Sequence, residues 1–171
     1  MWFADGRIWL LLTAAIAFPL AAEPGAAAAA GMDARPPAGR QNGLPSPAPE
    51  LEPAEVVQIQ LQALRENDET NEGIAVAFRF ASPRNKASTG PLARFIHMIK
   101  AGPYRLMLEF EHASFTPIVI EGVHAVQRVT LVGRREIRSY DFLLQRQAGP
   151  PCDGCWMTEA VIVVHGVEKA V

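Results

Sequence analysis

Residues 123–146, VHAVQRVTLVGRREIRSYDFLLQR, decide the class of fold. Residues 123–132 and residues 136–146 are two runs rich in β-branched, aromatic and other apolar side chains. Gly133 and the arginines beside it lie between the runs, which is typical of a tight hairpin. The sequence therefore predicts two neighbouring antiparallel strands.

Further β-like runs precede and follow this pair in the sequence, at residues 104–110, 116–121 and 156–164, and would add strands to the sheet. Along residues 136–146, alternation places Tyr140, Phe142 and Leu144 on one face and Asp141 on the other. We expect Asp141 to face outward or to lie at a cavity edge.

Helical patterns precede the strands. Pro53 suits a first turn, and Ala54, Val57, Leu61 and Leu64 form one apolar stripe. Residues 57–62, VQIQLQ, also alternate as a strand would, but their composition and length favour helix.

A second helix, capped by Asp68 or Asn71, is expected to run through about Arg79, with apolar positions at Ile74, Ala77, Phe78 and Ala81. Pro83 ends it, and residues 83–90 are expected to form a loop.

A third helix opens at residues 89–91, with Leu92, Phe95, Ile96 and Ile99 on its apolar face, and ends before Gly102 and Pro103. The expected fold is α+β: three N-terminal helices packed on a curved antiparallel sheet of four to five strands. Such a sheet can leave a cavity beneath the helices, and a ligand would bind there.

The central segment carries a recognisable string: FRFASP at residues 78–83, NK at 85–86, TGP at 89–91 and RF at 94–95, followed by Met98 and Tyr104. It resembles a family of bacterial and plant proteins known as domain of unknown function 4864, over about residues 50–165. That family is similar to the cone-shaped α+β proteins related to nuclear transport factor 2. Those include ketosteroid isomerases, dehydratases, polyketide cyclases and non-catalytic binding modules. The resemblance implies a cone-like fold and a possible homodimer through the open sheet face, but no particular reaction.

The segment at residues 82–91 is the first candidate site, because it places polar groups between two apolar helices. The candidate ligand-binding residues are Ser82, Asn85, Lys86, Thr89 and Arg94. Lys86, Arg94 and the free N–H groups of the following helix could bind a carboxylate or phosphate. Alternatively, Asn85 and Thr89 satisfy the backbone groups of the segment itself.

A cone-shaped enzyme would need an acid or base in its cavity. The candidates are His97 on the third helix, Tyr104 and Asp141. No Asp–His pair stands at a spacing typical of a dehydratase. A binding module is therefore preferred, and a cofactor-free isomerase, dehydratase or hydrolase is the alternative.

Cys152 and Cys155 form a CxxC pair before a strand, not at the start of a helix, so we expect a local disulfide. The two cysteines could instead be free or redox-active thiols. This gives a second alternative for the function, an envelope thiol-disulfide protein. A metal is not expected, because His112, His124 and His165 are not paired at ligand spacing. No cofactor is expected.

The N-terminal part has a different composition from the rest. Residues 1–22 resemble a secretory signal peptide, with Arg7 before an apolar run that is shorter than a membrane span. Residues 23–52 are rich in Pro, Ala and Gly and are expected to be a disordered linker. Residues 53–171 would be the single domain of a periplasmic or secreted protein. An uncleaved membrane anchor is the alternative.

The charge balance restricts the partners. The 171 residues have a formal net charge of -2, and residues 54–171 carry 13 Lys+Arg and 13 Asp+Glu. A nucleic-acid-binding domain would need an excess of positive charge, so we exclude that class. The expected function is an exported binding or interaction module, with a small molecule or a protein as its partner.

Overall fold

The computed structural model describes residues 40–41 and 43–164, and these form an α+β fold, as predicted. The helices in this part of the chain are α1 (Pro53–Arg65), α2 (Glu72–Arg79), α3 (Pro83–Thr89), α4 (Leu92–Lys100) and α5 (Leu106–Glu109), with a 3-10 turn, η1 (Gly102–Tyr104).

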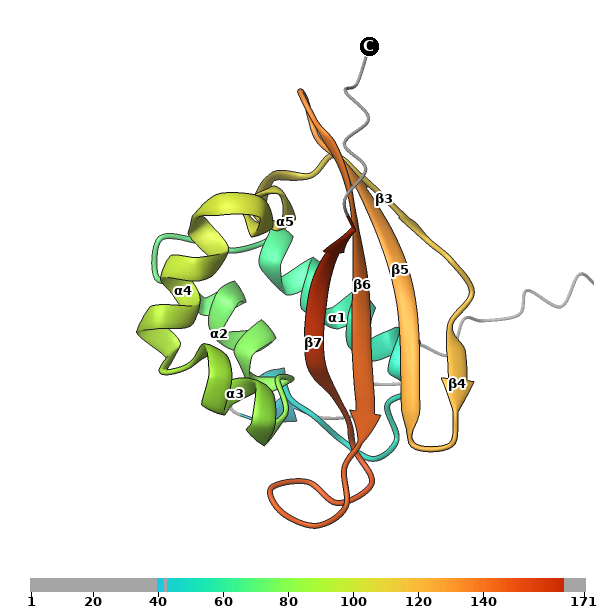
Figure 1. The fold of residues 1–171 in the computed structure, drawn as a ribbon. Helices are drawn as coiled ribbons and strands as arrows, with labels where there is room; N and C mark the ends of the chain where they lie inside the picture. The colour runs from blue at the N-terminus through green and yellow to red at the C-terminus, as the bar shows by residue number, and fades with distance from the viewer. Residues whose placement is uncertain (1–39, 42, 165–171) are drawn as a thin grey trace, which may run out of the picture. The chain divides into compact units, whose positions relative to one another are not determined.

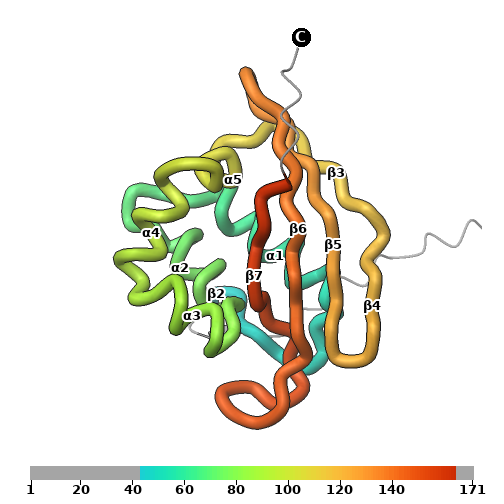
Figure 2. The backbone as a smooth tube through the Cα atoms, in the orientation of Figure 1, coloured from blue at the N-terminus to red at the C-terminus, as the bar shows by residue number. Residues whose placement is uncertain are grey.

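The strands form two antiparallel sheets. A small one pairs β1 (Arg40–Gln41) with β2 (Leu44–Pro45). The main one has five strands: β3 (His112–Phe115), β4 (Val119–Glu121), β5 (His124–Val132), β6 (Ile137–Arg146) and β7 (Trp156–Val164). Its order is β3-β5-β6-β7, and β4 also pairs with β5. Figure 2 shows β3 and β4 following one another along the same edge of β5.

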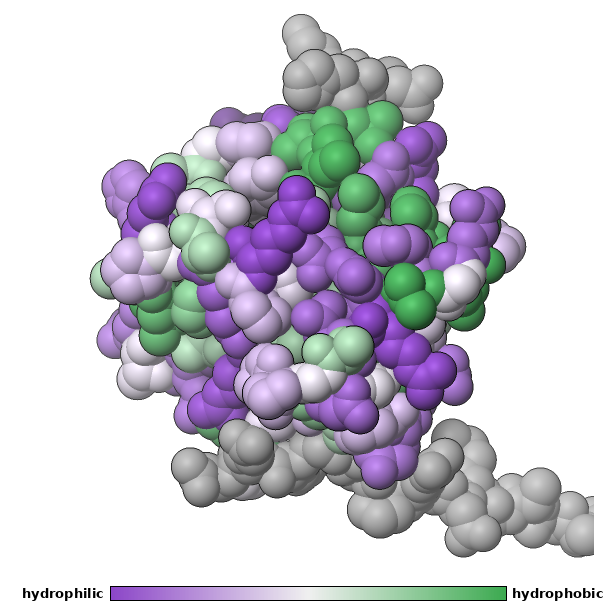
Figure 3. Space-filling model, turned by 60° about the horizontal axis from the view of Figure 1, so that its bottom comes forward, coloured by the Kyte–Doolittle hydropathy of each residue, from purple (hydrophilic) through white to green (hydrophobic). Residues whose placement is uncertain are grey.

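The helices cover one face of the main sheet (Figure 1). Alternate residues of the central strands are buried against them, among them Val129 on β5 and Tyr140 and Phe142 on β6. On the opposite face, Val119 of β4 pairs with Val126 of β5, and Val126 pairs with Leu143 of β6. An apolar row therefore crosses the outer face of the sheet. Figure 3 shows that apolar side chains also gather in patches on the surface of the molecule.

Helix α1 forms as its sequence predicts. Glu52 and Glu55 make a reciprocal capping box around Pro53. The predicted stripe is buried at Val57, Leu61 and Leu64, which excludes a strand at residues 57–62.

The turn between α1 and α2 is set by side chains that accept hydrogen bonds from backbone N–H groups. Asn67 Oδ1 accepts from Ile74 at 3.0 Å, and Asp68 Oδ1 accepts from Glu72 at 3.3 Å. Asn71, the other predicted cap, instead has a left-handed backbone with φ of 65° and makes no capping bond. The two helices approach so closely that a Cβ on Gly73 would overlap the Ala63 carbonyl oxygen and would lie 2.9 Å from Asn67 Cα.

Residues 83–90 were predicted as a loop, and that prediction was wrong. Most of the segment is α3, which begins at Pro83 with Ser82 as its N-cap; Ser82 Oγ accepts from the Asn85 N–H at 3.1 Å. Proline disfavours helical geometry in the residue before it but suits the first turn of a new helix. Pro83 therefore separates α2 from α3.

The strand predicted at residues 104–110 was also wrong. Tyr104 ends η1, and α5 follows. Leu106, Met107 and Phe110 are buried, a spacing that fits a helix face and not a strand. The strand predicted at residues 116–121 is a strand only at its end, where β4 lies. The strand before it, β3, ends at Phe115.

Part of the predicted linker belongs to the folded unit. Ser46, Ala48 and Leu51 are 2%, 8% and 5% exposed. The packed chain therefore begins before Pro53. The predicted signal peptide, residues 1–22, lies outside the described residues. Within the described residues, no helix combines the length and apolarity needed to span a bilayer.

Candidate functional site

A cavity of about 670 Å³ is lined by the helices and by the sheet, mostly by its inner face but also by outer-face residues such as Val126 and Leu143. Much of its wall is apolar, with Leu64 from α1, Phe95 and Ile99 from α4 and Met107 from α5. Ala77 and Ala81 on the same wall leave room that larger side chains would fill. Cavities of this size and character typically hold small organic molecules.

The cavity opens to solvent beside β7, which is the edge strand of the sheet. Arg84, Ser88 and Glu159 lie at its rim. Close to them, the pairing of β6 with β7 shifts by one residue between Leu143 and Leu144. Because exposed outer-face residues of β5 belong to the lining, the volume includes space that is open to solvent.

One polar pair interrupts the apolar wall. Gln60 of α1 and Thr158 of β7 are 4% and 2% exposed and both line the cavity. Thr158 Oγ1 lies 2.9 Å from Gln60 Nε2 and 2.9 Å from Gln60 Oε1. Buried polar groups in an apolar wall are normally hydrogen-bonded, and each of these two side chains is a hydrogen-bond partner of the other.

The backbone of Thr158 is held by the segment that joins α2 to α3. The Thr158 N–H donates to the Phe80 carbonyl at 2.8 Å, and the Thr158 carbonyl accepts from the Ser82 N–H at 2.9 Å. The same carbonyl accepts from Asn85 Nδ2 at 3.0 Å. The FRFASPRN string therefore fixes the cavity wall at the edge strand.

This segment lies within a stretch that a protein-family model covers. The model is described as a domain of unknown function (DUF4864), and it matches residues 49–171. The chain belongs to the DUF4864 family. No curated protein and no solved structure matches it significantly. The relation of the DUF4864 fold to nuclear transport factor 2, and the homodimer expected from it, stay predictions.

In this DUF4864 domain the predicted loop residues mostly contact other protein groups. Thr89 Oγ1 donates to the Asn85 carbonyl at 2.9 Å and also lies 3.0 Å from Asn85 Oδ1. Lys86 Nζ donates to the Arg79 carbonyl at 3.0 Å and sits 5.7 Å from the centre of the Phe78 ring. Burial lowers the pKa of Lys86. These contacts favour the backbone-satisfying interpretation over anion binding.

Arg94 is exposed on α4 and is not among the residues that line the cavity. Asn85 and Thr89 do line it, close to the rim. Ligand binding by this group therefore stays a prediction, with Asn85 and Thr89 the members placed to contact a molecule in the cavity.

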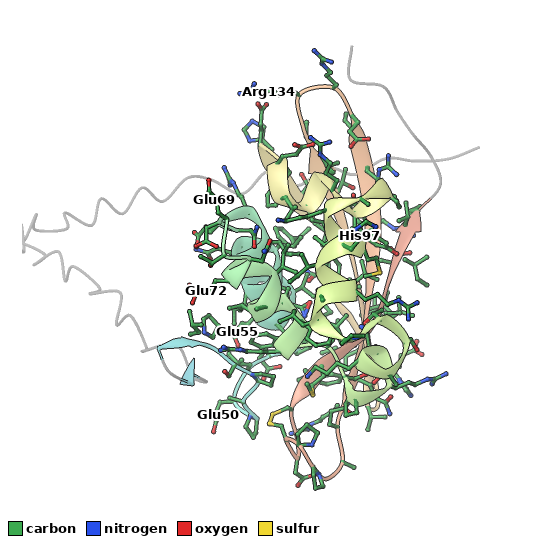
Figure 4. The ribbon with its side chains drawn as sticks, turned by 90° about the vertical axis from the view of Figure 1, so that its left-hand side faces the viewer. Glu50, Glu55, Glu69, Glu72, His97 and Arg134 are labelled. Carbon is green, nitrogen blue, oxygen red and sulfur yellow. A yellow bond between two sulfur atoms is a disulfide. The ribbon has the colours of Figure 1, made fainter. Side chains whose placement is uncertain are left out.

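The three candidate catalytic residues lie in different parts of the domain and do not share one cavity. His97 is exposed on α4, as Figure 4 shows, and does not line the cavity. Asp141 lies on the outer face, where Arg128 Nε and Nη2 donate to its carboxylate at 2.7 and 2.8 Å. Arg128 lowers the pKa of Asp141.

Tyr104 is the candidate that lines the cavity. Its hydroxyl donates to the Val161 carbonyl at 3.0 Å, and burial raises its pKa. A phenol with a raised pKa stays protonated at neutral pH, so it can donate a hydrogen bond but is a poor base.

Cys152 and Cys155 form a disulfide, as predicted, and no cysteine in the described chain is free. The bond lies in the loop between β6 and β7. Cys152 Sγ is 3.9 Å from the Pro47 carbonyl, so this loop adjoins the packed residues before α1. Among the described residues, no three His, Cys, Asp or Glu side chains gather as a metal site requires.

Gln60 and Thr158 are site residues that the sequence reasoning missed. Gln60 occupies a position on the apolar stripe of α1, between Val57 and Leu64. A glutamine on such a stripe is the signal that could have pointed to a polar group facing the interior.

Proposed function

We propose that this protein is an exported binding module that holds a small, mainly apolar molecule in the cavity beside β7. The observation that carries the proposal is the cavity itself, about 670 Å³ with an apolar wall and one buried polar pair. Protein interiors are close-packed, so a domain that binds no ligand would be expected to fill this space with side chains.

The alternative of a cofactor-free isomerase, dehydratase or hydrolase has weaker support. Of its candidate groups, Tyr104 lines the cavity but is a poor base, while Asp141 is paired with Arg128 on the outer face. Glu159 at the rim is a carboxylate that this alternative could use. An envelope thiol-disulfide protein acting through Cys152 and Cys155 is the other alternative.

The test of binding is a fluorescence titration of the full chain with N-phenyl-1-naphthylamine, an uncharged probe whose emission rises in apolar surroundings. We expect saturable binding to one site. Replacing Ala81, which lines the cavity, with Leu adds bulk to the wall and should weaken binding about tenfold or more.

The matched control is Ala87→Leu, the same substitution at an exposed position of α3 that does not line the cavity. It should leave the affinity unchanged. Circular dichroism confirms that both variants fold. Absence of saturable binding, or equal binding by the two variants, would contradict a ligand in this cavity.

We further propose that residues 1–22 direct export, which places the disulfide in an oxidising compartment. The intact mass of the protein from a Gram-negative periplasm should correspond to cleavage after Ala22 or after Ala30. Recovery of the full-length mass in the cytoplasm would contradict export, and a full-length protein held in the membrane would favour the anchor.

A further inference from the structure

We infer that the cavity selects uncharged molecules with an apolar body and one terminal hydroxyl or carbonyl oxygen, which sits against Gln60 and Thr158. The inference rests on the proposed function, because it concerns the ligand of the same cavity. Three observations carry it: the unused hydrogen-bonding capacity of the polar pair, the geometry within the pair, and the placement of charge around the cavity.

The first observation is that the polar pair does not use all of its hydrogen-bonding groups. A glutamine amide has two N–H donors and an oxygen with two lone pairs, and a threonine hydroxyl has one donor and two lone pairs. In the described part of the chain, the Gln60 side chain bonds to Thr158 Oγ1 alone. One amide N–H and one or more lone pairs therefore remain for a molecule in the cavity.

The second observation is the geometry within the pair. Thr158 Oγ1 lies 2.9 Å from both the nitrogen and the oxygen of the Gln60 amide. The hydroxyl can thus donate to Oε1 and accept from Nε2 at the same time, which leaves one amide N–H, one lone pair on Oε1 and one on Oγ1. A ligand hydroxyl can accept from this N–H or donate to one of these lone pairs, and a ligand carbonyl can accept from the N–H.

The third observation is where the charges lie. The Lys, Arg, His, Asp and Glu residues in the lining of the described chain are Arg84 and His124, which are exposed, and Glu159, which is partly exposed at the bulge. Gln60 and Thr158 are almost completely buried, and no cation lies among their hydrogen-bonding partners in the described residues. A carboxylate placed against them would lose its hydration without gaining an opposite charge, which is costly.

The neighbouring wall explains why the rest of the ligand should be apolar. Leu64 lies one turn beyond Gln60 on α1, and Phe95 and Met107 face the same cavity. Burying a hydrocarbon body against these side chains contributes about 25 cal/mol for each Å² removed from water. The apolar body supplies affinity, and the polar pair discriminates among end groups.

The experiment compares decanol with decanoate, which have the same chain length and differ in their end group. Each displaces N-phenyl-1-naphthylamine from the full-length protein at neutral pH, where decanoate is ionised. We expect decanol to bind about tenfold more tightly than decanoate.

The deciding variant is Gln60→Leu with Thr158→Val, which removes both polar groups and leaves neither without a partner, so the domain should still fold. The probe should still bind to it, while the affinity for decanol should fall about tenfold, because the decanol hydroxyl loses its hydrogen-bonding partners. Thr130→Val is the matched control, because Thr130 Oγ1 makes a similar bond, 2.8 Å long, to Ser139 Oγ away from the cavity. This control should keep the wild-type affinity for decanol.

The outcomes separate the inference from the function on which it rests. If the probe binds but decanoate displaces it as well as decanol does, the inference is wrong and the cavity is still a binding site. The same conclusion follows if the double variant binds decanol as tightly as the wild type does. If neither the probe nor decanol binds, both proposals fail.

Discussion

Replacing Gly73 with Ala gives a sharp test of the packing described above, because two physical effects have opposite signs. Ala is favoured over Gly within a helix by about 1 kcal/mol, so propensity alone predicts a more stable protein. The structure predicts the reverse. The new Cβ would overlap the Ala63 carbonyl oxygen and approach Asn67 Cα to 2.9 Å, and both are backbone atoms that cannot rotate away.

The magnitude follows from the displacement that the overlap requires. To restore normal contact, α2 must shift away from α1 by more than about an ångström, which disturbs Ile74, a residue with 0% exposure. Overpacking of this kind costs about 1–3 kcal/mol or more. Since the overlap is with rigid backbone atoms, we expect a steric cost at the upper end of that range, about 3 kcal/mol. The helix propensity of Ala offsets about 1 kcal/mol of it, so the free energy of unfolding should fall by about 2 kcal/mol.

The assay is urea unfolding of the full chain followed by circular dichroism, with the unfolding free energy taken from the midpoint and slope. Ala75→Gly, two residues further along the same helix, measures the propensity effect by itself and should cost about 1 kcal/mol. A Gly73→Ala protein as stable as the wild type, or more stable, would refute the close approach of α1 and α2.

Three further predictions follow from individual contacts. The native protein should react with no thiol reagent, and replacing Cys152 and Cys155 with Ser should lower stability by about 2 kcal/mol, since the closed loop is short; two reactive thiols in protein purified without a reductant would contradict this. Because Arg128 lowers the pKa of Asp141, their contribution to stability is present above about pH 4 and is lost as the pH falls through the lowered pKa. Asp141→Asn should therefore flatten the loss of Tm in acid, and an unchanged profile would count against the pair. Asn85→Ala removes the bonds to the Thr158 carbonyl and to the Thr89 hydroxyl and should cost about 1–2 kcal/mol in urea unfolding, whereas a neutral effect would mean that α3 is not held to β7.

The sequence predicted the elements whose periodicity is long and unambiguous. The strand at residues 156–164 coincides with β7, and the alternation of Tyr140, Phe142 and Leu144 toward the core is confirmed. Helices α1, α2 and α4 lie where their apolar spacing placed them. These stretches bury one face each, so their patterns report directly on the fold.

The errors have local causes. Residues 104–110 form a short apolar run, and such a run is compatible with a strand or with one turn of buried helix. Pro83 is compatible both with the end of one helix and with the first turn of the next, and the sequence does not distinguish the two. Both errors occur where fewer than two turns of helix leave too little periodicity to recognise.

The cavity could be expected from the class of fold, but its polar pair could not be located from sequence. Gln60 and Thr158 come from opposite ends of the domain, and only the packing of α1 against β7 brings them together. The string that identifies the family was easier to find because it is contiguous. Its contacts hold the cavity wall in place, a role that the residue types alone do not distinguish from ligand binding.

The bonds that hold Thr158 have a consequence for how the domain is assembled. Gln60 and Asn85 contact this residue across sequence separations of 98 and 73 residues. Contacts of such range close late in folding, since the chain must first lose the entropy of a long loop. A growing polypeptide thus contains its helical segments before it contains the strand that fixes them, and the cavity is complete only when β7 docks.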